Sequence, residues 1–193
     1  MKNQKTTIVL DTETTGLSPL NDEMLQLSII DGEGNKLFDE LLKPTKNKSW
    51  KEAEKINHIS PRMVADKYDI DYYHDEVQEI LNSADCIIGY NTDFDLAFLR
   101  FSKFEIPQCK IIDVMLMYSK NFGKWNDYYR DYKWEKLTTA SAHYKFQWKE
   151  DAHNSLGDCK ATLYVYKKLL EDGIYFNECS KLNHYRRLKF KGK

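Results

Sequence analysis

The residues best suited to chemistry in this sequence are acidic side chains that follow a strand-like segment. Asp11 and Glu13 lie two residues apart, directly after the β-rich run from Thr6 to Leu10. If the extended backbone continues through Thr12, both carboxylates project from one face, because strand side chains alternate with a period of two. Two anions at one point repel unless cations neutralise them, and carboxylate oxygens suit Mg²⁺ or Mn²⁺. The alternative is that Asp11 merely ends the strand and Glu13 is solvated.

A second acidic segment, Asn91-Thr92-Asp93-Phe94-Asp95, follows a short apolar run where a helix begins. Its carboxylates could join the first pair if the two strand ends meet. The alternative is ordinary capping, in which Asn91 or Thr92 caps the helix and both acids favour the positive end of its dipole.

The third segment is His153-Asn154-Ser155-Leu156-Gly157-Asp158, in which Asp158 is expected to open the final helix. His153 is expected on the preceding loop, where a histidine with an unperturbed pKa of about 6.5 suits a general base. The alternative is a surface histidine beside an N-capping aspartate.

The turn Thr14-Thr15-Gly16-Leu17 follows the first acidic pair. A turn that ends in glycine leaves backbone N–H groups able to meet a phosphate or a sugar hydroxyl, and glycine permits close approach.

Alternating strands and helices must position these groups. Strands are expected at residues 6–10, 24–31 and 36–43, with the turn formers of 31–35 joining the last two as a hairpin. The remaining elements expected are helical pieces from Trp50 onward, a helix capped by Ser60-Pro61, a helix around 77–81, strands at 86–90 and 110–112, and helices at 94–101, 137–144 and 158–170. This order indicates a mixed α/β layer.

The composition limits the class of protein. The 193 residues include 29 basic and 30 acidic side chains, a formal charge of −1, and 41% hydrophobic residues, which excludes a disordered polyelectrolyte. No apolar run is long enough for a signal peptide or a membrane span. The four cysteines form no C-x-x-C pair, which favours reduced thiols. We expect one cytoplasmic globular domain with no membrane partner, which holds any polyanion through local basic groups or bound metal.

The order of the three segments is more specific than any one of them. D-T-E-T-T-G, N-x-x-F-D-x-x-F-L and H-N-x-x-G-D resemble the three motifs of the DEDDh, or DnaQ-like, 3′-to-5′ exonucleases, over residues 6–171. The resemblance implies an α/β fold of the ribonuclease H-like type: a mixed five-stranded sheet, with three antiparallel N-terminal strands plus parallel strands, flanked by helices. It implies an exonuclease domain at 1–175 and a basic C-terminal tail at 176–193.

The same resemblance assigns the site. The four metal-binding acids are Asp11, Glu13, Asp95 and Asp158, and the general base is His153. Asp93 is not the family acid, because the acid of the second motif follows the aromatic residue. The tyrosine variant of the family places its base at the position of Asn154, so the histidine class fits, and His143 is interpreted as structural. Tyr90 and Asn57 stand where many members have histidine.

The implied activity is hydrolysis of single-stranded DNA 3′ ends to nucleoside 5′-monophosphates, with two divalent cations, Mg²⁺ or Mn²⁺, and possible service as the proofreading subunit of a DNA polymerase. Candidate substrate-binding residues are Thr14, Thr15, Gly16, Leu17, Ile59, Asn91, Phe94 and Phe98. For Phe98, helical spacing favours core packing over substrate contact.

Two other functions stay open: a 3′-to-5′ exoribonuclease or oligonucleotide-trimming enzyme, and a catalytically silent module that binds nucleic acid or polymerase. The aromatic stretch and the basic C-terminal tail each have two interpretations. The aromatic stretch 122–134 is either a lid over single-stranded substrate or a partner interface or cap over the core. The tail 181–193, with six basic residues, either contacts phosphates or is a frayed solubilising end.

Overall fold

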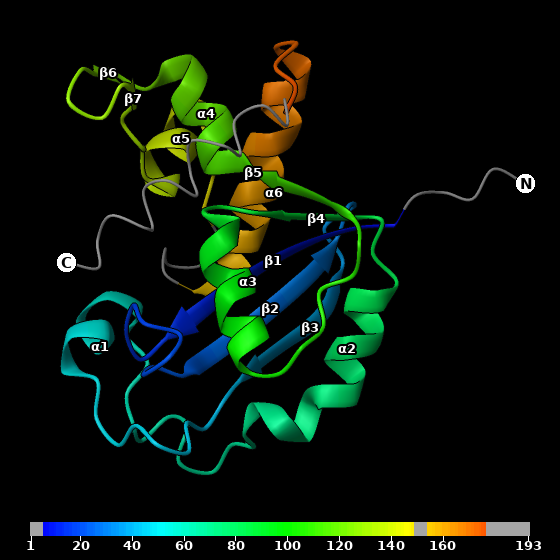
Figure 1. The fold of residues 1–193 in the computed structure, drawn as a ribbon, viewed down its shortest axis with the longest axis vertical. Helices are drawn as coiled ribbons and strands as arrows, with labels where there is room; N and C mark the ends of the chain where they lie inside the picture. Colours follow the sequence, from blue (N-terminus) through cyan, green and yellow to red (C-terminus); the bar gives the residue numbers. More distant parts are fainter. Residues whose placement is uncertain (1–5, 149–153, 177–193) are drawn as a thin grey trace, which may run out of the picture.

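The computed structural model describes residues 6–148 and 154–176. Its centre is a five-stranded sheet in the order β3-β2-β1-β4-β5 (Figure 1). β1 (Thr7–Thr14) pairs antiparallel with β2 (Met24–Asp31), which pairs antiparallel with β3 (Lys36–Leu41). On the other side, β4 (Cys86–Gly89) is parallel to β1, and β5 (Lys110–Asp113) is parallel to β4. The expected mixed sheet is therefore confirmed.

The β2–β3 hairpin closes through one carboxylate. Asp31 accepts hydrogen bonds from the backbone N–H groups of Glu33 and Asn35, each at 2.9 Å. A side chain that bonds its own backbone a few residues on replaces a backbone turn, so the predicted hairpin forms where the turn residues lie.

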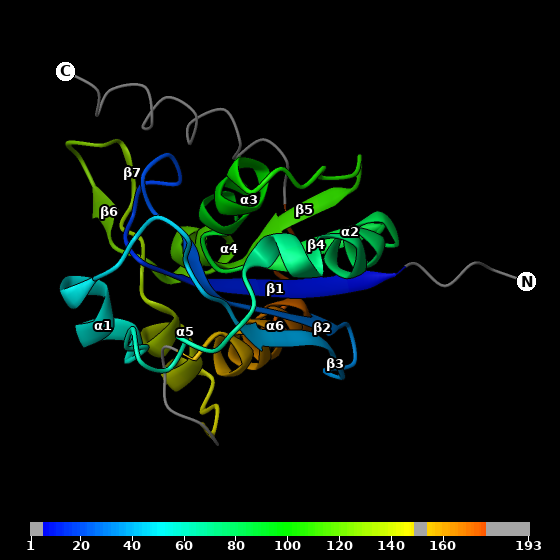
Figure 2. The same ribbon diagram turned by 90° about the horizontal axis from the view of Figure 1, so that it is seen from below.

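Two hydrophobic cores lie on the two faces of the sheet, because alternate strand residues point in opposite directions. Ile8 and Leu10 of β1 belong to the core beneath α2 (His74–Asn82) and α3 (Thr92–Phe101). Val9 belongs to the core that contains α4 (Val114–Phe122), α5 (Leu137–His143) and α6 (Ser155–Glu171). Figure 2 shows α2 and α3 on one side of β1, and α5 and α6 on the other.

The final helix begins one turn earlier than expected. Asn154 is the N-cap of α6, and its side chain accepts a hydrogen bond from the Gly157 N–H at 3.3 Å. Asp158 therefore lies inside the first turn and does not open the helix. The sequence shows several cap-like residues here, and the local geometry selects Asn154.

The predicted helix after Ser60-Pro61 is wrong. α1 (Lys51–Asn57) ends before it, and residues 61–66 form turns. The Met63 N–H bonds the Ser60 carbonyl and the Lys67 N–H bonds the Val64 carbonyl. Val64 is buried in a small core cluster with Leu25, Trp50 and Ile59, so side-chain burial outweighs the local helix signal.

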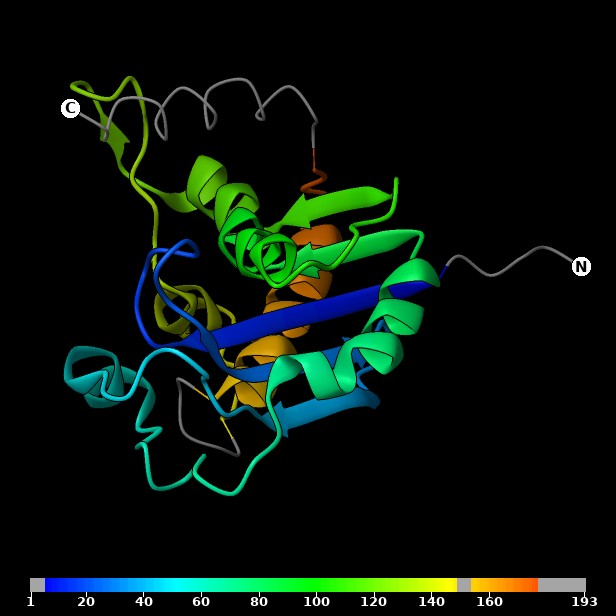
Figure 3. The same cartoon turned by 60° about the horizontal axis from the view of Figure 1, so that its bottom comes forward.

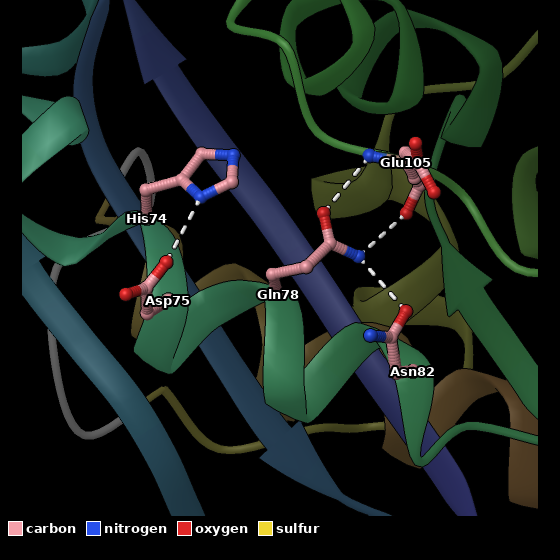
Figure 4. A network of polar contacts seen from close by, with 5 residues as sticks. All are labelled: His74, Asp75, Gln78, Asn82 and Glu105. Carbon is pink, nitrogen blue, oxygen red and sulfur yellow. Dashed lines mark hydrogen bonds and ion pairs between the residues drawn. The ribbon is translucent and has the colours of Figure 1, made fainter.

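The connection from the first helix to α2 includes a short 3₁₀ helix, Ile70–Tyr73. α2 is then fixed to the segment after α3 through one side chain. Gln78 donates to the Glu105 carbonyl and accepts from the Glu105 N–H, both at 2.9 Å, as Figure 4 shows. A side-chain amide that satisfies both backbone groups of one residue holds the two segments in one register.

Three elements after β5, namely α4, β6 and β7, were not predicted. α4 begins directly at the strand end, where the Asp113 carboxylate accepts a hydrogen bond from the Leu116 N–H at 3.2 Å. Beyond α4 lies a small two-stranded sheet of β6 (Trp125–Asn126) and β7 (Asp131–Tyr132). Strands of two residues are too short to show an alternating pattern in the sequence.

Among residues 6–148 and 154–176, no helix is both long and apolar enough to cross a membrane. The predicted basic tail lies outside the described residues from position 177 onward.

Candidate active site

Three acidic side chains from two distant parts of the chain, β1 and α6, meet at the C-terminal end of β1. β1 stays extended through Thr14, so Asp11 and Glu13 share a face as the alternation predicts. α6 packs on β1 and β2 and brings Asp158 to the same place. One carboxylate oxygen from each of these three residues lies within 4.8 Å of the others. This separation is short enough for all three to bind one cation.

Asp95 approaches this group from α3 and is held by the strand residue between the two acids. Its Oδ1 accepts hydrogen bonds from the Thr12 backbone N–H at 3.0 Å and from the Thr12 hydroxyl at 2.7 Å. The Asp95 side chain is almost fully buried. Its charge raises the pKa of Asp11, so the fourth predicted acid lies close to the other three.

The electrostatics of the group favour neutralisation. Burial, then the charges of Asp95, Asp158 and Glu13, raises the pKa of Asp11 well above its ordinary value. Burial, then the charges of Asp158 and Asp95, raises the pKa of Glu13 to about 8. Burial raises the pKa of Asp95 to about 7, although the hydrogen bonds from Thr12 oppose this shift. Near neutral pH these carboxylates either retain protons or require cations.

The donor set fits a divalent cation. All three clustered ligands are carboxylate oxygens, and hard oxygen donors select Mg²⁺ or Mn²⁺ over softer metals. Such a cation, when bound, supplies positive charge at a phosphoryl oxygen and lowers the pKa of a bound water. The residues that would hold it are Asp11, Glu13 and Asp158, with Asp95 beside them.

The predicted general base, His153, lies outside the described residues, and its role stays a prediction. The competing histidine, His143, packs within an aromatic cluster of α4 and α5. Its Nδ1 lies 2.9 Å from the Tyr118 hydroxyl, and its ring stacks on Tyr144. These contacts hold the exposed His143 in a structural role against α4, as the sequence predicts.

The turn after β1 is held by internal bonds, which changes the interpretation of two residues. The Thr15 N–H donates to the Glu23 carbonyl at 2.9 Å, so this amide is engaged within the protein. Gly16 is approached closely by the Asp22 side chain of the protein rather than by a ligand. A Cβ at Gly16 would lie 2.5 Å from a carboxylate oxygen of Asp22. The Thr14 hydroxyl donates to the Gly16 carbonyl at 2.6 Å. A substrate contact of Thr14 or Thr15 therefore stays a prediction.

Two cavities flank the carboxylates. The first, of about 560 Å³, includes Glu13 in its wall, and the second, of about 620 Å³, includes Asp158. Leu17 and Phe94 line both cavities and therefore divide them. Leu17 is 85% exposed, which is unusual for a leucine and leaves it accessible to a ligand. The first cavity also contains Thr12, Thr14, Thr15, Gly16, Trp50, Lys51, Glu52, Ala53, Ile56 and Asn57; the second also contains Tyr90, Asn91, Met115, Trp134, Glu135, Lys136, Leu137 and Thr138.

Two predicted substrate-binding residues belong to the protein interior. Ile59 is 4% exposed, packs on Trp50 and accepts a hydrogen bond from the indole N–H of that residue through its carbonyl. Phe98 is 1% exposed and therefore packs in the core, as its helical spacing favours. Neither lines the two cavities beside the carboxylates. Asn91, by contrast, lines the second cavity, in a left-handed backbone conformation with φ of 69°.

The structure adds two residues that sequence analysis did not place in the site, Thr12 and Asn57. Asn57 is 6% exposed, donates to the Thr14 carbonyl at 3.2 Å and accepts from the Ile59 N–H at 3.1 Å. It also forms a side-chain hydrogen bond with Glu13 that lowers the pKa of this carboxyl. The only sequence signal for Asn57 is its position where many members of the resembled family have histidine. Thr12 has no such signal, because an alternating strand predicts that it points away from Asp11 and Glu13.

Comparison with known proteins agrees with this geometry. Residues 8–166 match the family model RNase_T, which is described as an exonuclease. The chain belongs to this exonuclease family. It is 30% identical over 176 residues to an uncharacterized exonuclease, CP81, of Escherichia phage 186, covering 86% of this chain and 89% of the phage protein. The expected DEDD-type exonuclease and phosphodiester hydrolase are confirmed.

Two larger relatives contain a similar segment. The chain is 26% identical to the 3′-5′ exonuclease DinG of Bacillus subtilis, covering 88% of this chain and 18% of DinG. It is 29% identical to the PolC-type DNA polymerase III of Thermotoga maritima, covering 86% of this chain and 12% of that protein. This exonuclease thus corresponds to a small part of each of these relatives.

Solved structures share its fold. Exonuclease I of E. coli, in complex with a dA16 oligonucleotide, aligns with a TM-score of 0.69 at 21% identity, over 86% of this chain and 41% of that one. Exonuclease X, in complex with 5′ overhanging duplex DNA, aligns with a TM-score of 0.66 at 18% identity, over 89% of this chain and 95% of that one. The ribonuclease H-like exonuclease fold is therefore confirmed.

Proposed function

We propose that this exonuclease hydrolyses single-stranded DNA from the 3′ end and releases nucleoside 5′-monophosphates. The observation that carries the proposal is the meeting of Asp11, Glu13 and Asp158 within 4.8 Å at the end of β1, with Asp95 fixed beside them. One buried carboxylate and three half-buried ones at one point repel each other, which is costly unless a cation uses them. A silent binding module has no use for this arrangement.

In this proposal two divalent cations, Mg²⁺ or Mn²⁺, are held by the four carboxylates. The charges of Asp95, Asp158 and Glu13 all raise the pKa of Asp11, so this carboxylate would help to hold the cations together with each of the other acids. His153 would accept the proton of the attacking water as general base, and the scissile phosphate would lie over the carboxylates. Because the metals supply the positive charge, a chain of net charge −1 does not need a broad basic surface.

The two cavities support an extended single strand as the substrate. Leu17 and Phe94 separate them, so the last two bases would lie on opposite sides of this apolar pair, with the phosphate between Glu13 and Asp158. Stacking of bases on such side chains tolerates any sequence. The DNA in the complex of Exonuclease I, which shares this fold, is consistent with DNA as the nucleic acid. The PolC-type relatives support a polymerase as partner, in a proofreading role.

The test compares four end-labelled substrates: single-stranded DNA, single-stranded RNA, blunt duplex DNA and a dinucleotide. Each is incubated with Mg²⁺, with Mn²⁺ and with a chelator, and the products are identified by mass. We expect stepwise shortening of single-stranded DNA from the 3′ end, 5′-monophosphate products, and complete reversible inhibition by chelation. Faster cleavage of RNA than of DNA would replace the proposed substrate, and cleavage from the 5′ end would refute the polarity.

A further inference from the structure

The β6–β7 hairpin is the part of the described chain that the proposed reaction does not use. It spans residues 124–134 and extends beyond the main sheet from the end of α4, as Figure 1 shows. Its two short strands pair Trp125 with Tyr132, and the Lys133 N–H donates to the Lys124 carbonyl at 2.8 Å.

The base of the hairpin is fixed to the body of the domain. The Glu135 N–H donates to the Ser119 hydroxyl at 3.1 Å, and the Glu135 carbonyl accepts from the Tyr90 hydroxyl at 2.8 Å. Gly123 packs so closely that a Cβ would lie 2.4 Å from the Ser119 carbonyl oxygen and 2.6 Å from that of Lys133. The hairpin therefore projects at a defined position relative to the site.

That position adjoins the second cavity. Trp134, Glu135 and Lys136, which follow β7, line the cavity that contains Asp158. Figure 3 shows the hairpin and α1 on the same side of the molecule, with the loop after β1 between them. A strand that leaves the carboxylates through the second cavity thus meets the base of the hairpin first.

The surface of the hairpin has the composition of a base-stacking platform. Its exposed large side chains are aromatic: Trp125 is 54% exposed, Tyr128 86% and Tyr129 59%. Leucine, isoleucine and valine, which dominate apolar protein interfaces, are absent from residues 122–134. Four basic side chains are exposed beside these rings, namely Lys124, Arg130, Lys133 and Lys136. Aromatic rings between cations are the arrangement that binds single-stranded nucleic acid without regard to sequence.

The acidic residues leave this surface with an excess of positive charge, because residues 124–136 contain four basic side chains and three acidic ones, Asp127, Asp131 and Glu135. Asp127 accepts a hydrogen bond from the Trp125 indole N–H at 2.9 Å, and Asp131 accepts one from the Tyr132 N–H at 2.8 Å. Both carboxylates thus bond to groups within the hairpin.

We propose that residues 124–136 are a second nucleic-acid site, which stacks the unpaired bases several nucleotides upstream of the cleaved 3′ end. The inference rests on the proposed function, since it continues the same strand. The site makes long single strands better substrates than dinucleotides, and it favours ends whose upstream nucleotides are unpaired.

The test uses the full chain with Tyr128→Ser/Tyr129→Ser. Binding of a single strand of about 12 nucleotides is measured by fluorescence anisotropy, with phosphorothioate linkages at the 3′ end to prevent cleavage. Hydrolysis of a dinucleotide is measured in parallel. We expect the double variant to bind the long strand at least about fivefold more weakly, with unchanged dinucleotide turnover.

The matched control is Tyr68→Ser/Tyr72→Ser. This second tyrosine pair is similarly exposed, 56% and 62%, but lies around the short 3₁₀ helix and outside both cavities. Unchanged long-strand binding in the hairpin variant, as a protein interface would give, overturns the proposal. An equal loss in the control pair, or an equal loss of dinucleotide turnover, also overturns it.

If the double variant unfolds, the same two measurements are made on Tyr128→Ser alone, which changes the most exposed ring. Weaker binding of the long strand with unchanged dinucleotide turnover supports the proposal, and unchanged binding overturns it. The proposed exonuclease function and the proposed hairpin site can be refuted independently. If the wild-type protein hydrolyses neither substrate, the exonuclease assignment fails, while the anisotropy measurement still tests the hairpin.

Discussion

The hydroxyl of Thr12 donates a hydrogen bond of 2.7 Å to Oδ1 of Asp95, across 83 residues of sequence. The backbone N–H of Thr12 donates to the same oxygen at 3.0 Å. Both bonds engage one carboxylate oxygen and fix the plane of the group beside Asp11. The residue between the two strand acids therefore positions the acid of α3.

Replacing Thr12 with valine removes the hydroxyl and keeps the shape of the side chain. A buried hydrogen bond to a charged group contributes about 1.5–3 kcal/mol, so we expect a fall in kcat of roughly 10- to 100-fold. Mn²⁺ affinity, measured by calorimetry, should fall as well, and Thr12→Ser should restore both. If Thr12→Val has the same kcat and the same Mn²⁺ affinity as the wild type, the hydroxyl has no positioning role.

A buried polar contact fixes the start of α6, which carries Asp158. The Ser28 and Ser155 hydroxyls lie 2.5 Å apart, and Ser28 donates to Asp39 at 2.8 Å. Ser28→Ala leaves the buried Ser155 hydroxyl without this partner, so the free energy of unfolding should fall by about 1–3 kcal/mol in urea titrations. Ser83→Ala removes an exposed hydroxyl and serves as control. Equal stability losses in the two variants would contradict the role of the contact.

The metal-free protein should lose stability as the pH rises. The pKa of Asp95 is raised to about 7 and that of Glu13 to about 8, whereas both carboxyls titrate near pH 4 in the unfolded chain. Between these values the folded state binds more protons than the unfolded state, so the free energy of unfolding decreases with increasing pH. We expect the Tm in chelator to fall from about pH 5 to about pH 8.

Mg²⁺ should oppose this loss, because a cation replaces the protons of the clustered carboxylates. The matched variant is Glu13→Gln, whose Tm should depend less on pH in chelator. A Tm that rises with pH across this range in the metal-free wild type would refute the raised pKa values of Asp95 and Glu13.

Neutral replacement of the clustered acids should remove activity and preserve the fold. Asp158→Asn and Asp95→Asn should each lower kcat by roughly 1,000-fold, since metal ions contribute several kcal/mol to the transition state. Asp93→Asn, two residues from Asp95, is the control and should stay within a few-fold of the wild type. A complete loss in Asp93→Asn would mean that the wrong acid of α3 has been assigned.

Leu17→Ala tests the boundary between the two cavities. Because Leu17 is 85% exposed, its truncation should leave the Tm unchanged. Loss of stacking on a terminal base should raise KM for single-stranded DNA by about fivefold or more, with a smaller change in kcat. An unchanged KM in Leu17→Ala would show that Leu17 does not contribute to substrate binding.

Local patterns predicted much of this molecule. The alternation that places Asp11 and Glu13 on one face, the 31–35 turn and the order of strands and helices depend on residues close in sequence. The Ser60-Pro61 helix failed for the same reason, because its local signal carries no information about the burial of Val64. The start of α6 was displaced since several neighbouring residues can cap a helix.

The sequence by itself determined which acids are available, in what order, and at the ends of which elements. Only the tertiary structure decided which oxygens meet, that Thr12 holds Asp95, that Ile59 and Phe98 are interior, and that Leu17 and Phe94 divide two cavities. These relationships depend on the register of strands and on the packing of helices across the sheet. Side-chain periodicity within one element does not encode how that element is placed against another.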